Sequence, residues 1–357
     1  MTEYSVTSLS LSNAWHRSAV TALLHAENLR LDENLDYTCG IFDEEMNLIA
    51  TGSCFANTLR CIAVCSSHRG EGLTSSLITH LLTIQAERGN THVFLYTKCE
   101  TAAFFHDLGF FEIARVRPKI VFMENRRNGF STYLQRLVHS LPEKTSFGNA
   151  AIVMNANPFT LGHLSLIERA CQENDLVHLF ILSENTGPIP FSVRKRLVLQ
   201  GTSHLSNLLI HDSGPYLISN ATFPSYFQPD SDAAAKSHAL LDLALFARIA
   251  QRLQITARYV GEEPNSHVTA LYNEVMQHQL PAYGISCRIL PRLTANGSLV
   301  SASSVRQLLK EFQQTHAPQC LARLRTLVPA STYHYFSSPE AECVLERIAV
   351  CDRLNHH

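Results

Sequence analysis

A hydroxyl, a glycine and an imidazole follow one another closely in Thr160-Leu161-Gly162-His163. An apolar run at 150–154 precedes this segment and a helical pattern follows it, so we expect a strand, a loop and a helix. Unpaired N–H groups and a positive macrodipole attract anions to a helix start. The residue types therefore predict phosphate binding, with Asn157 in the preceding turn as a further ligand. A capped helix with a surface histidine is the alternative.

Three other segments place cations, serines or glycines at the expected start of a helix. They are Gly70-Glu71-Gly72, then 190–196 with Arg194, and then 301–306 with Ser301, Ser303, Ser304 and Arg306. Serine is a good N-cap, and a glycine turn lets backbone N–H groups cradle a phosphate. Each segment alone has an ordinary explanation, because solvated arginines, serine caps and glycine turns are common. The early loop and the late serine-and-arginine helix start together favour phosphate binding.

The elements that must position these side chains indicate an α/β protein. An apolar strand at 176–182 follows the helix after His163 and closes a strand–helix–strand unit, which implies a parallel sheet. A right-handed crossover puts the loop with Thr160 at the carboxyl edge of the strands. Ligands bind at that edge in such sheets, so the predicted fold agrees with the predicted chemistry.

The composition fits a globular protein without a strongly charged partner. The chain has 357 residues, 45% of them hydrophobic and 17% charged, which allows two domains with sizeable cores. A net charge of -2 indicates neither nucleic acid nor a membrane surface, and no apolar run is long enough to span a bilayer. The polar start is unlike a signal peptide, and the ten cysteines form no C-x-x-C pair. We expect a cytoplasmic protein with reduced cysteines and no metal site of its own.

The sequence predicts a first domain over 1–124, a linker over 125–147, a second domain over 148–336 and a helical tail over 337–357. In the first domain a strand ends at the turn with Gly70 and Gly72, a helix and a strand follow, and Phe104-Phe105-His106-Asp107-Leu108-Gly109-Phe110 leads to the last strand. This order resembles the GNAT acyltransferase fold, in which the glycine turn binds the pyrophosphate of coenzyme A. The match is partial, because Ser67 replaces the family's Gln or Arg. The resemblance implies an α+β domain that either binds a CoA-like group, transfers acetyl groups or serves only for docking.

The second domain resembles the nucleotidyltransferase superfamily, a Rossmann-like fold with a (His/Thr)-x-Gly-His signature and a later Ile-Ser-Ser-Thr-x-x-Arg signature. The corresponding segments here are 160–163 and 300–306. Longer segments at 155–163, 213–227 and 261–264 narrow the resemblance to the citrate lyase ligase family. That family also has a GNAT-like domain in front, so the resemblance covers nearly the whole chain.

The resemblance implies an acid–thiol ligase. ATP, acetate and the thiol of a dephospho-CoA-type prosthetic group on the citrate lyase acyl carrier subunit would give the acetyl thioester, AMP and pyrophosphate, through acetyl-adenylate. The acetyl thioester is the active form of citrate lyase. Mg²⁺ is expected on the triphosphate, held mainly by phosphate oxygens and water.

Positioned donors and cations would stabilise the charge that develops on the phosphates. We expect His163 and Thr160 to donate to the α- and β-phosphates, while Gly162 lets the backbone approach closely. We expect Arg306 and its serine turn to hold the β- and γ-phosphates, with Arg194 as a weaker candidate.

Two further assignments concern other parts of the chain. Glu262 and Glu263 follow a strand end, where they either lie near the ribose or the metal or form a solvated turn. Gly70 and Gly72 would let the first domain grip the dephospho-CoA arm of the carrier and present its thiol.

Two rival functions use the same signatures. A cofactor-biosynthesis adenylyltransferase would join ATP to a phosphorylated small molecule, and its pyrophosphate exchange would need that acceptor instead of acetate. A non-catalytic nucleotide or acyl-CoA sensor would bind ATP without releasing pyrophosphate. The GNAT-like domain and the segment at 213–227 argue against the first rival, and Thr160, His163 and Arg306 argue against the second.

Overall fold

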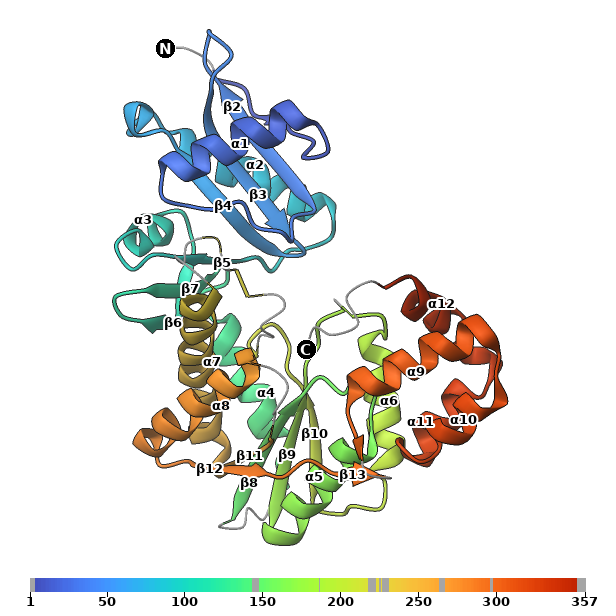
Figure 1. Cartoon of the computed structure of the whole chain (residues 1–357). Coiled ribbons are helices and arrows are strands. Elements are labelled where there is room, and N and C mark those ends of the chain that lie inside the picture. The colour runs from blue at the N-terminus through green and yellow to red at the C-terminus, as the bar shows by residue number, and fades with distance from the viewer. Residues whose placement is uncertain are drawn as a thin grey trace. The chain divides into compact units, whose positions relative to one another are not determined.

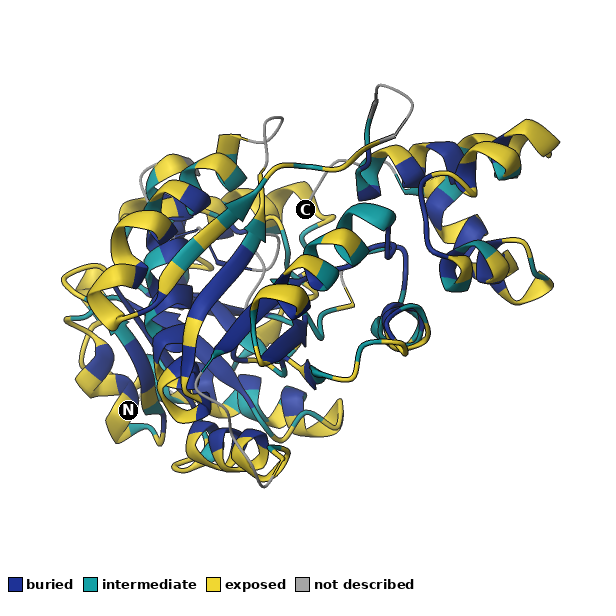
Figure 2. Cartoon of the chain, turned by 90° about the horizontal axis from the view of Figure 1, so that it is seen from below, coloured by how far each residue is buried: buried dark blue, intermediate teal, exposed yellow. Residues whose placement is uncertain are grey.

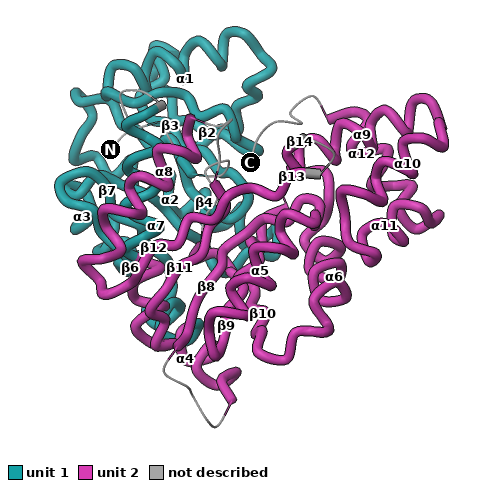
Figure 3. The backbone as a smooth tube through the Cα atoms, turned by 60° about the horizontal axis from the view of Figure 1, so that its bottom comes forward, with its two compact units in different colours: residues 1–133, 223–244 teal, residues 134–222, 245–357 magenta. Residues whose placement is uncertain are grey.

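The computed structural model describes residues 4–142, 148–185, 187–217, 223–224, 226, 231–262, 267–295 and 298–351. They form two compact units, each built from two stretches of chain (Figures 1 and 3). Unit 1 comprises Met1–Tyr133 and Phe223–Ala244, and unit 2 comprises Leu134–Thr222 and Leu245–His357. This division differs from the sequence-based boundaries, which keep 223–244 in the second domain.

Unit 1 is built on a seven-stranded sheet with the order β1-β2-β3-β4-β5-β7-β6. The strands are β1 (Thr7–Ser8), β2 (Tyr37–Phe42), β3 (Leu48–Phe55), β4 (Thr58–Val64), β5 (Phe94–Thr97), β6 (Phe111–Val116) and β7 (Ile120–Glu124). Neighbouring strands are antiparallel except β4 and β5, which are parallel. The helices include α1 (Ala14–Ala26), α2 (Leu73–Glu87) and α3 (Ala102–Asp107), and α1 and α2 pack on β3 and β4. The expected order of strand, glycine turn, helix and strand is confirmed.

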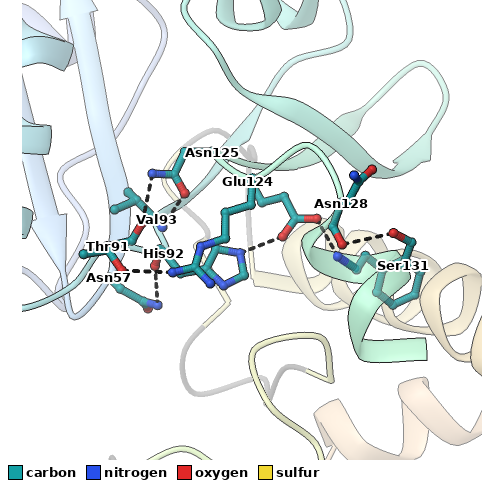
Figure 4. Close-up of polar contacts among 10 residues, drawn as sticks. Asn57, Thr91, His92, Val93, Glu124, Asn125, Asn128 and Ser131 are labelled. Atoms are coloured by element: carbon teal, nitrogen blue, oxygen red, sulfur yellow. Dashed lines mark hydrogen bonds and ion pairs between the residues drawn. The ribbon is translucent and has the colours of Figure 1, made fainter. Parts of the chain in front are cut away.

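The carboxylate of Glu124 fixes the direction in which the chain leaves this sheet. Glu124 is 3% exposed, and its Oε2 lies 2.6 Å from Nε2 of His92. Its Oε1 accepts a hydrogen bond from the backbone N–H of Phe130, at 2.8 Å, in the first turn of α4 (Gly129–His139), as Figure 4 shows. Helix α4 lies within the stretch 125–147 that the sequence assigns to a linker. A buried carboxylate with both oxygens bonded in this way serves the structure of the helix start.

Unit 2 is built on a five-stranded sheet with the order β10-β9-β8-β11-β12. The strands are β8 (Asn149–Met154), β9 (Leu176–Ile181), β10 (Leu208–Asp212), β11 (Ile255–Gly261) and β12 (Ser286–Leu290), and all of their pairings are parallel. The expected Rossmann-like parallel sheet is therefore confirmed. The chain builds the sheet outward from β8 in one direction and then in the other, so the loop after β8 lies at the point where the strand order reverses. Open α/β sheets bind ligands at this point.

Helices pack against the parallel sheet, and its central strands β8 and β9 are buried almost throughout, while the edge strand β12 has no buried residue (Figure 2 colours the chain by burial). The helices are α5 (Leu161–Glu173), α6 (Phe191–Gly201), α8 (His267–Gln279), α9 (Ala302–Thr315), α10 (Pro318–Leu324), α11 (Ala330–Phe336) and α12 (Glu342–Val350), while α7 (Ser231–Leu253) belongs partly to each unit. The short strands β13 (Thr294–Ala295) and β14 (Ser298–Leu299) pair with each other. Within the described residues, no helix combines the length and the apolar character that a membrane crossing needs.

The helix expected in the tail is present as α12, and it belongs to the core of unit 2. Val344, Leu345 and Ile348 are buried in the same hydrophobic cluster as Ile152 of β8 and Leu179 of β9. Apolar residues at helical spacing near the chain end therefore complete a core that the central strands begin.

Candidate functional site

Thr160 and His163 hold the start of α5 by a reciprocal capping arrangement. Thr160 Oγ1 accepts a hydrogen bond from the backbone N–H of His163 at 3.3 Å, and Nδ1 of His163 accepts one from the backbone N–H of Thr160 at 3.1 Å. This is the capping box, with His163 in the place that Glu or Gln usually takes. The sequence motif therefore has a structural role before any ligand is considered, and Thr160 is only 1% exposed.

The capping arrangement also determines which ring nitrogen of His163 carries a proton. A backbone N–H can only donate, so Nδ1 of His163 is an acceptor. The neutral imidazole therefore has its N–H at Nε2, on the opposite side of the ring. The ring of Phe159 lies nearly parallel to the imidazole, with centroids 6.2 Å apart. His163 is thus held as a neutral hydrogen-bond donor next to the positive end of α5.

Gly162 allows the start of α5 to lie against the segment that precedes α9. A Cβ atom at Gly162 would stand 3.3 Å from the backbone oxygen of Val300 and 3.6 Å from Oγ1 of Thr160. The sequence assigned this glycine to close approach by a phosphate, which stays a prediction. The structure shows that it admits the Val300 backbone, so the two signature segments are neighbours.

The start of α9 has its own capping box, formed by serines. Ser301 Oγ accepts from the backbone N–H of Ser304 at 3.0 Å, and the backbone N–H of Ser301 donates to Ser304 Oγ at 3.3 Å. The expected serine cap is therefore present at Ser301. Ser303 points to a different partner, because its Oγ accepts from Nη2 of Arg306 at 3.0 Å.

Arg306 connects the two signature segments directly. Its Nη1 donates to the backbone carbonyl oxygen of Asn157, and the side chain is only 2% exposed. Burial lowers the pKa of Arg306 to about 10, which leaves the guanidinium charged at neutral pH. The structure therefore places a buried positive charge beneath the loop between β8 and α5.

Arg194 lies at the same edge of the sheet, but its guanidinium is committed to the backbone. It donates to the carbonyl oxygens of Asn155, Leu182, Glu184 and Ile189. The side chain is 1% exposed, and burial lowers its pKa to about 10. The sequence makes Arg194 a weaker candidate for holding the β- and γ-phosphates, and that assignment stays a prediction. Arg194 holds together the loops that follow β8 and β9.

Asn157 carries a polar atom that the described protein does not satisfy. Its side-chain Oδ1 is buried and has no hydrogen-bond partner among the described residues. A Cβ atom on Gly187 would lie 2.2 Å from Nδ2 of Asn157, so this glycine makes room for the amide. Buried polar atoms are normally paired, so the Asn157 oxygen fits a hydroxyl or amino group of a bound molecule. This acceptor, the Nε2 donor of His163 and the start of α5 together fit a nucleotide.

The remaining candidates lie elsewhere. Gly70 and Gly72 belong to unit 1, with φ of 92° and 78°, and Gly72 immediately precedes α2. Glu262 is exposed at the end of β11, while Glu263 lies outside the described residues, as does part of the segment 213–227. In the described part of the chain, no cluster of three His, Cys, Asp or Glu side chains is placed to hold a metal.

Two supporting contacts could not be found from sequence. Thr332 Oγ1 of α11 donates to the carbonyl oxygen of Phe159 at 3.0 Å, and the backbone N–H of Leu161 donates to that of Leu327 at 3.0 Å. Both fix the loop before α5 from a distant part of the chain. Neither Thr332 nor Leu327 stands in a motif, so no sequence signal marks them.

Comparison with known proteins gives consistent matches over most of the chain. The family model for the citrate lyase ligase C-terminal domain matches residues 149–336. Proteins named [citrate [pro-3S]-lyase] ligase from Haemophilus influenzae and Escherichia coli K12 are each 37% identical, covering 89% of this chain and 94% and 90% of their own lengths. The protein of that name from Klebsiella pneumoniae is 38% identical, covering 83% of this chain and 87% of its own length.

Other matches cover shorter parts. A phosphopantetheine adenylyltransferase from Staphylococcus haemolyticus is 32% identical over 71 residues, which is 19% of this chain and 44% of that protein. The solved structure of Escherichia coli ElaA is 14% identical, covering 35% of this chain and 100% of that one, with a TM-score of 0.31. A putative acyl-CoA N-acyltransferase from Klebsiella pneumoniae is 18% identical, covering 34% of this chain and 95% of that one, with a TM-score of 0.28.

Proposed function

The chain belongs to the citrate lyase ligase family, and from this premise we propose that it activates citrate lyase by acetylating the thiol of its prosthetic group. The acetyl donor is acetate, and ATP supplies the driving force by cleavage to AMP and pyrophosphate. The acceptor is a dephospho-CoA-type group on the acyl carrier subunit. Support comes from relatives of this name that match along most of the chain.

The chemistry explains why a nucleotide site is needed. A carboxylate is a poor electrophile, so a thiol cannot displace its oxygen at neutral pH. Attack of an acetate oxygen on the α-phosphorus of ATP forms acetyl-adenylate and releases pyrophosphate. The thiol sulfur then attacks the carbonyl carbon, loses its proton, and displaces AMP. The first step concentrates negative charge on the phosphates, and fixed donors stabilise that charge.

The observation that carries this proposal is the junction of the two signature segments at the start of α5. Nε2 of His163 is the donor assigned to the α-phosphate, and the positive end of the α5 helix dipole supplements it. The guanidinium of Arg306 bonds the backbone of Asn157 from beneath the loop and supplies positive charge to the site. Thr160, Ser301, Ser303 and Ser304 keep both helix starts in place, so we assign them to the site as supports of its phosphate-binding geometry. A Mg²⁺ ion on the triphosphate would neutralise further charge.

The test is exchange of labelled pyrophosphate into ATP by the full chain. We expect exchange that depends on acetate and that needs no thiol carrier, because adenylation precedes thiol attack. Adding the holo carrier subunit should then give the acetyl thioester and AMP. If exchange occurs without the carrier but no thioester forms when the carrier is added, the adenylation step is supported and the carrier is not the acceptor.

One rival function requires a separate condition in this assay. Similarity to a phosphopantetheine adenylyltransferase over 71 residues favours a nucleotidyl transfer to a phosphorylated acceptor as the second candidate. Exchange supported by 4′-phosphopantetheine and not by acetate would select that candidate. Binding of ATP without exchange under either condition would select a sensor.

We assign to unit 1 the binding of the carrier's prosthetic group. Gly70 and Gly72 form a turn with positive φ directly before α2, where backbone N–H groups can bind the diphosphate of dephospho-CoA. Calorimetry of the full chain with dephospho-CoA tests this assignment, with Gly72→Val as the variant that should lose affinity. Equal affinity of that variant would remove the turn from the site.

A further inference from the structure

Helix α12 lies alongside α9, the helix that begins at the serine turn (Figure 1). The two helices share one hydrophobic cluster, which contains Val305 and Leu309 of α9 and Val344 and Ile348 of α12. Close packing of buried side chains fixes how two helices lie against each other. The position of α12 is therefore set relative to the signature segment that starts at Ser301.

The carboxyl end of α12 reaches the candidate site. Burial lowers the pKa of Arg306, and the thiol of Cys351, the first residue after α12, raises it again through its charge. An electrostatic effect of this kind requires that the two groups lie close together. The last turn of α12 therefore lies near the guanidinium that joins the two signature segments.

Arg347, in this last turn, contacts the loop that follows β9. Its Nη2 donates to the backbone carbonyl oxygen of Gly187 at 3.2 Å. Gly187 is the glycine that makes room for the buried amide of Asn157. Arg347 therefore stands at the carboxyl edge of the parallel sheet, beside the loop that covers this amide.

Arg347 differs from the two buried arginines of this edge in its access to solvent. Arg194 and Arg306 are almost fully buried and bond to backbone carbonyl oxygens. Arg347 is exposed, and its contact with Gly187 uses one of the five N–H donors of a guanidinium. Within the described ranges it forms no ion pair with a carboxylate. Its charge and its other donors are thus available to an anion that enters from solvent.

The place of Arg347 indicates which part of a nucleotide would reach it. The proposed function assigns the α-phosphate to His163 and the later phosphates to the serine turn of α9, on which α12 packs. We propose that Arg347 binds the β- and γ-phosphates of ATP, an inference that rests on the proposed function.

This contact acts on the leaving group of the adenylation step. As the acetate oxygen bonds to the α-phosphorus, the bond from that phosphorus to the bridging oxygen breaks, and its electron pair stays on pyrophosphate. A guanidinium that holds the β- and γ-phosphates stabilises this growing charge, because its bonds to phosphate oxygens are charge-assisted.

A purely structural role for Arg347 is the alternative. A cation in the last turn of a helix is favourable by itself, and the bond to Gly187 would then serve only to hold the loop. The two roles predict different dependence on the ligand. Support of the loop beside Asn157 affects AMP and ATP alike, whereas binding of the β- and γ-phosphates affects ATP and pyrophosphate and leaves AMP unchanged.

Calorimetry of the full chain with AMP, and with ATP in the presence of Mg²⁺, separates these roles. Arg347→Gln should weaken ATP binding about tenfold and leave AMP binding unchanged. Arg347→Lys keeps the charge without the planar fork, so its ATP affinity should fall between those of Arg347→Gln and the wild type. Arg252→Gln is the matched control, because Arg252 is also an exposed arginine in the last turn of a helix. It precedes β11 at the opposite edge of the sheet, so this variant should bind ATP like the wild type.

Kinetics and stability give independent measurements on the same variants. In pyrophosphate exchange, Arg347→Gln should raise the KM for pyrophosphate and leave the KM for acetate unchanged. Its urea midpoint should equal that of the wild type, because an exposed side chain contributes little to stability.

Each contrary result has a definite meaning. Equal ATP affinities of Arg347→Gln and the wild type would overturn the inference. Equal losses for AMP and ATP would also overturn it and would assign Arg347 to support of the loop. Failure of the wild type to bind ATP would reject both the inference and the nucleotide site. Loss of ATP affinity in Arg347→Gln, combined with wild-type exchange that acetate does not support, would reject the proposed acid substrate and uphold Arg347.

Discussion

Nη1 of Arg306 donates a hydrogen bond to the backbone carbonyl oxygen of Asn157, across 149 positions of sequence. This contact joins the loop after β8 to the start of α9, and Gly162 allows the same two segments to touch through Val300. The site is therefore a single structure made from two distant motifs, and each motif depends on the other for its position.

Replacing Arg306 should affect both stability and activity. In Arg306→Met the carbonyl of Asn157 loses a buried donor, at a cost of about 1–3 kcal/mol. In Arg306→Lys the charge remains, but the planar fork that reaches both Asn157 and Ser303 is lost. We expect both variants to lose most pyrophosphate exchange, with Arg306→Lys the more stable in urea unfolding. Wild-type exchange in Arg306→Met would show that the contact is dispensable.

His163 allows its capping role and its proposed catalytic role to be separated. The side-chain oxygen of His163→Asn can replace Nδ1 as the acceptor for the Thr160 N–H, while it offers nothing in place of Nε2. We expect this variant to unfold near the wild-type urea concentration and to lose exchange. His163→Ala should also lose exchange and in addition cost about 1 kcal/mol for the lost cap. Near wild-type exchange by either variant would remove His163 from the chemistry.

Gly162→Ala tests the junction between the two motifs. The added methyl group would stand 3.3 Å from the Val300 oxygen, so the start of α5 and the segment before α9 must separate slightly. We expect a fall in exchange of about tenfold or more with a modest loss of stability. Gly261→Ala is the control for stability, because a Cβ there meets nothing within 4 Å. Equal exchange by Gly162→Ala and the wild type would contradict a tightly built junction.

Arg194 and Lys195 are adjacent on α6 and should respond very differently to truncation. Arg194→Ala leaves backbone carbonyls of several loops without their buried donor, so we expect a loss of about 3 kcal/mol or more. Lys195 is partly exposed and pairs with Asp212 at 2.6 Å, and Lys195→Ala should cost less than about 1 kcal/mol. Urea unfolding of both variants measures the difference, and equal losses would contradict the structural role of Arg194.

The buried histidines of β9 and β10 should make the protein sensitive to acid. Nδ1 of His178 lies 3.0 Å from Nε2 of His211, and burial lowers the pKa of His178 to about 3 and that of His211 to about 4. Below about pH 6.5 these two histidines bind protons in the unfolded chain but stay neutral in the folded protein. The free energy of unfolding therefore falls as the pH drops from there toward 4. The slope approaches about 1.4 kcal/mol per pH unit for each histidine.

The double variant His178→Gln/His211→Gln removes both titrating groups and keeps polar side chains in their place. Its urea midpoint should change less between pH 7 and pH 5 than that of the wild type. His204→Gln, at a surface histidine paired with Glu168, is the control and should keep the wild-type dependence. An unchanged pH dependence in the double variant would assign the acid sensitivity to other groups.

The sequence predicts those parts of this molecule that depend on local patterns. The strand, loop and helix around Thr160, the serine cap at Ser301 and the parallel sheet all follow from hydrophobic period and helix-start chemistry. Phosphate binding by Thr160 and His163 is inferred from the same rules and stays a prediction. These features involve residues a few positions apart, where composition and spacing contain the information.

The parts that sequence did not predict depend on contacts between distant segments. Arg194 looked like a helix residue facing solvent or phosphate, and its burial beneath loops from β8 and β9 could not be read from a helical pattern. The same holds for Thr332, which supports Phe159 from α11. The place of 223–244 in unit 1 could not be predicted either, because the hydrogen bond from Tyr226 to the backbone oxygen of Tyr96 joins segments 130 positions apart.

The path of the chain has a consequence for synthesis on the ribosome. Unit 1 receives Phe223–Ala244 only after the strands β8, β9 and β10 of unit 2 have been made. The hydrogen bond from the Tyr226 hydroxyl to the backbone oxygen of Tyr96 cannot form in a nascent chain that ends at Tyr133, so the first unit emerges without this contact to β5. Vectorial folding, one domain after another, is the usual route for chains of this size. Here the order of translation and the order of completion differ, so a fragment cut after α4 lacks part of its own unit.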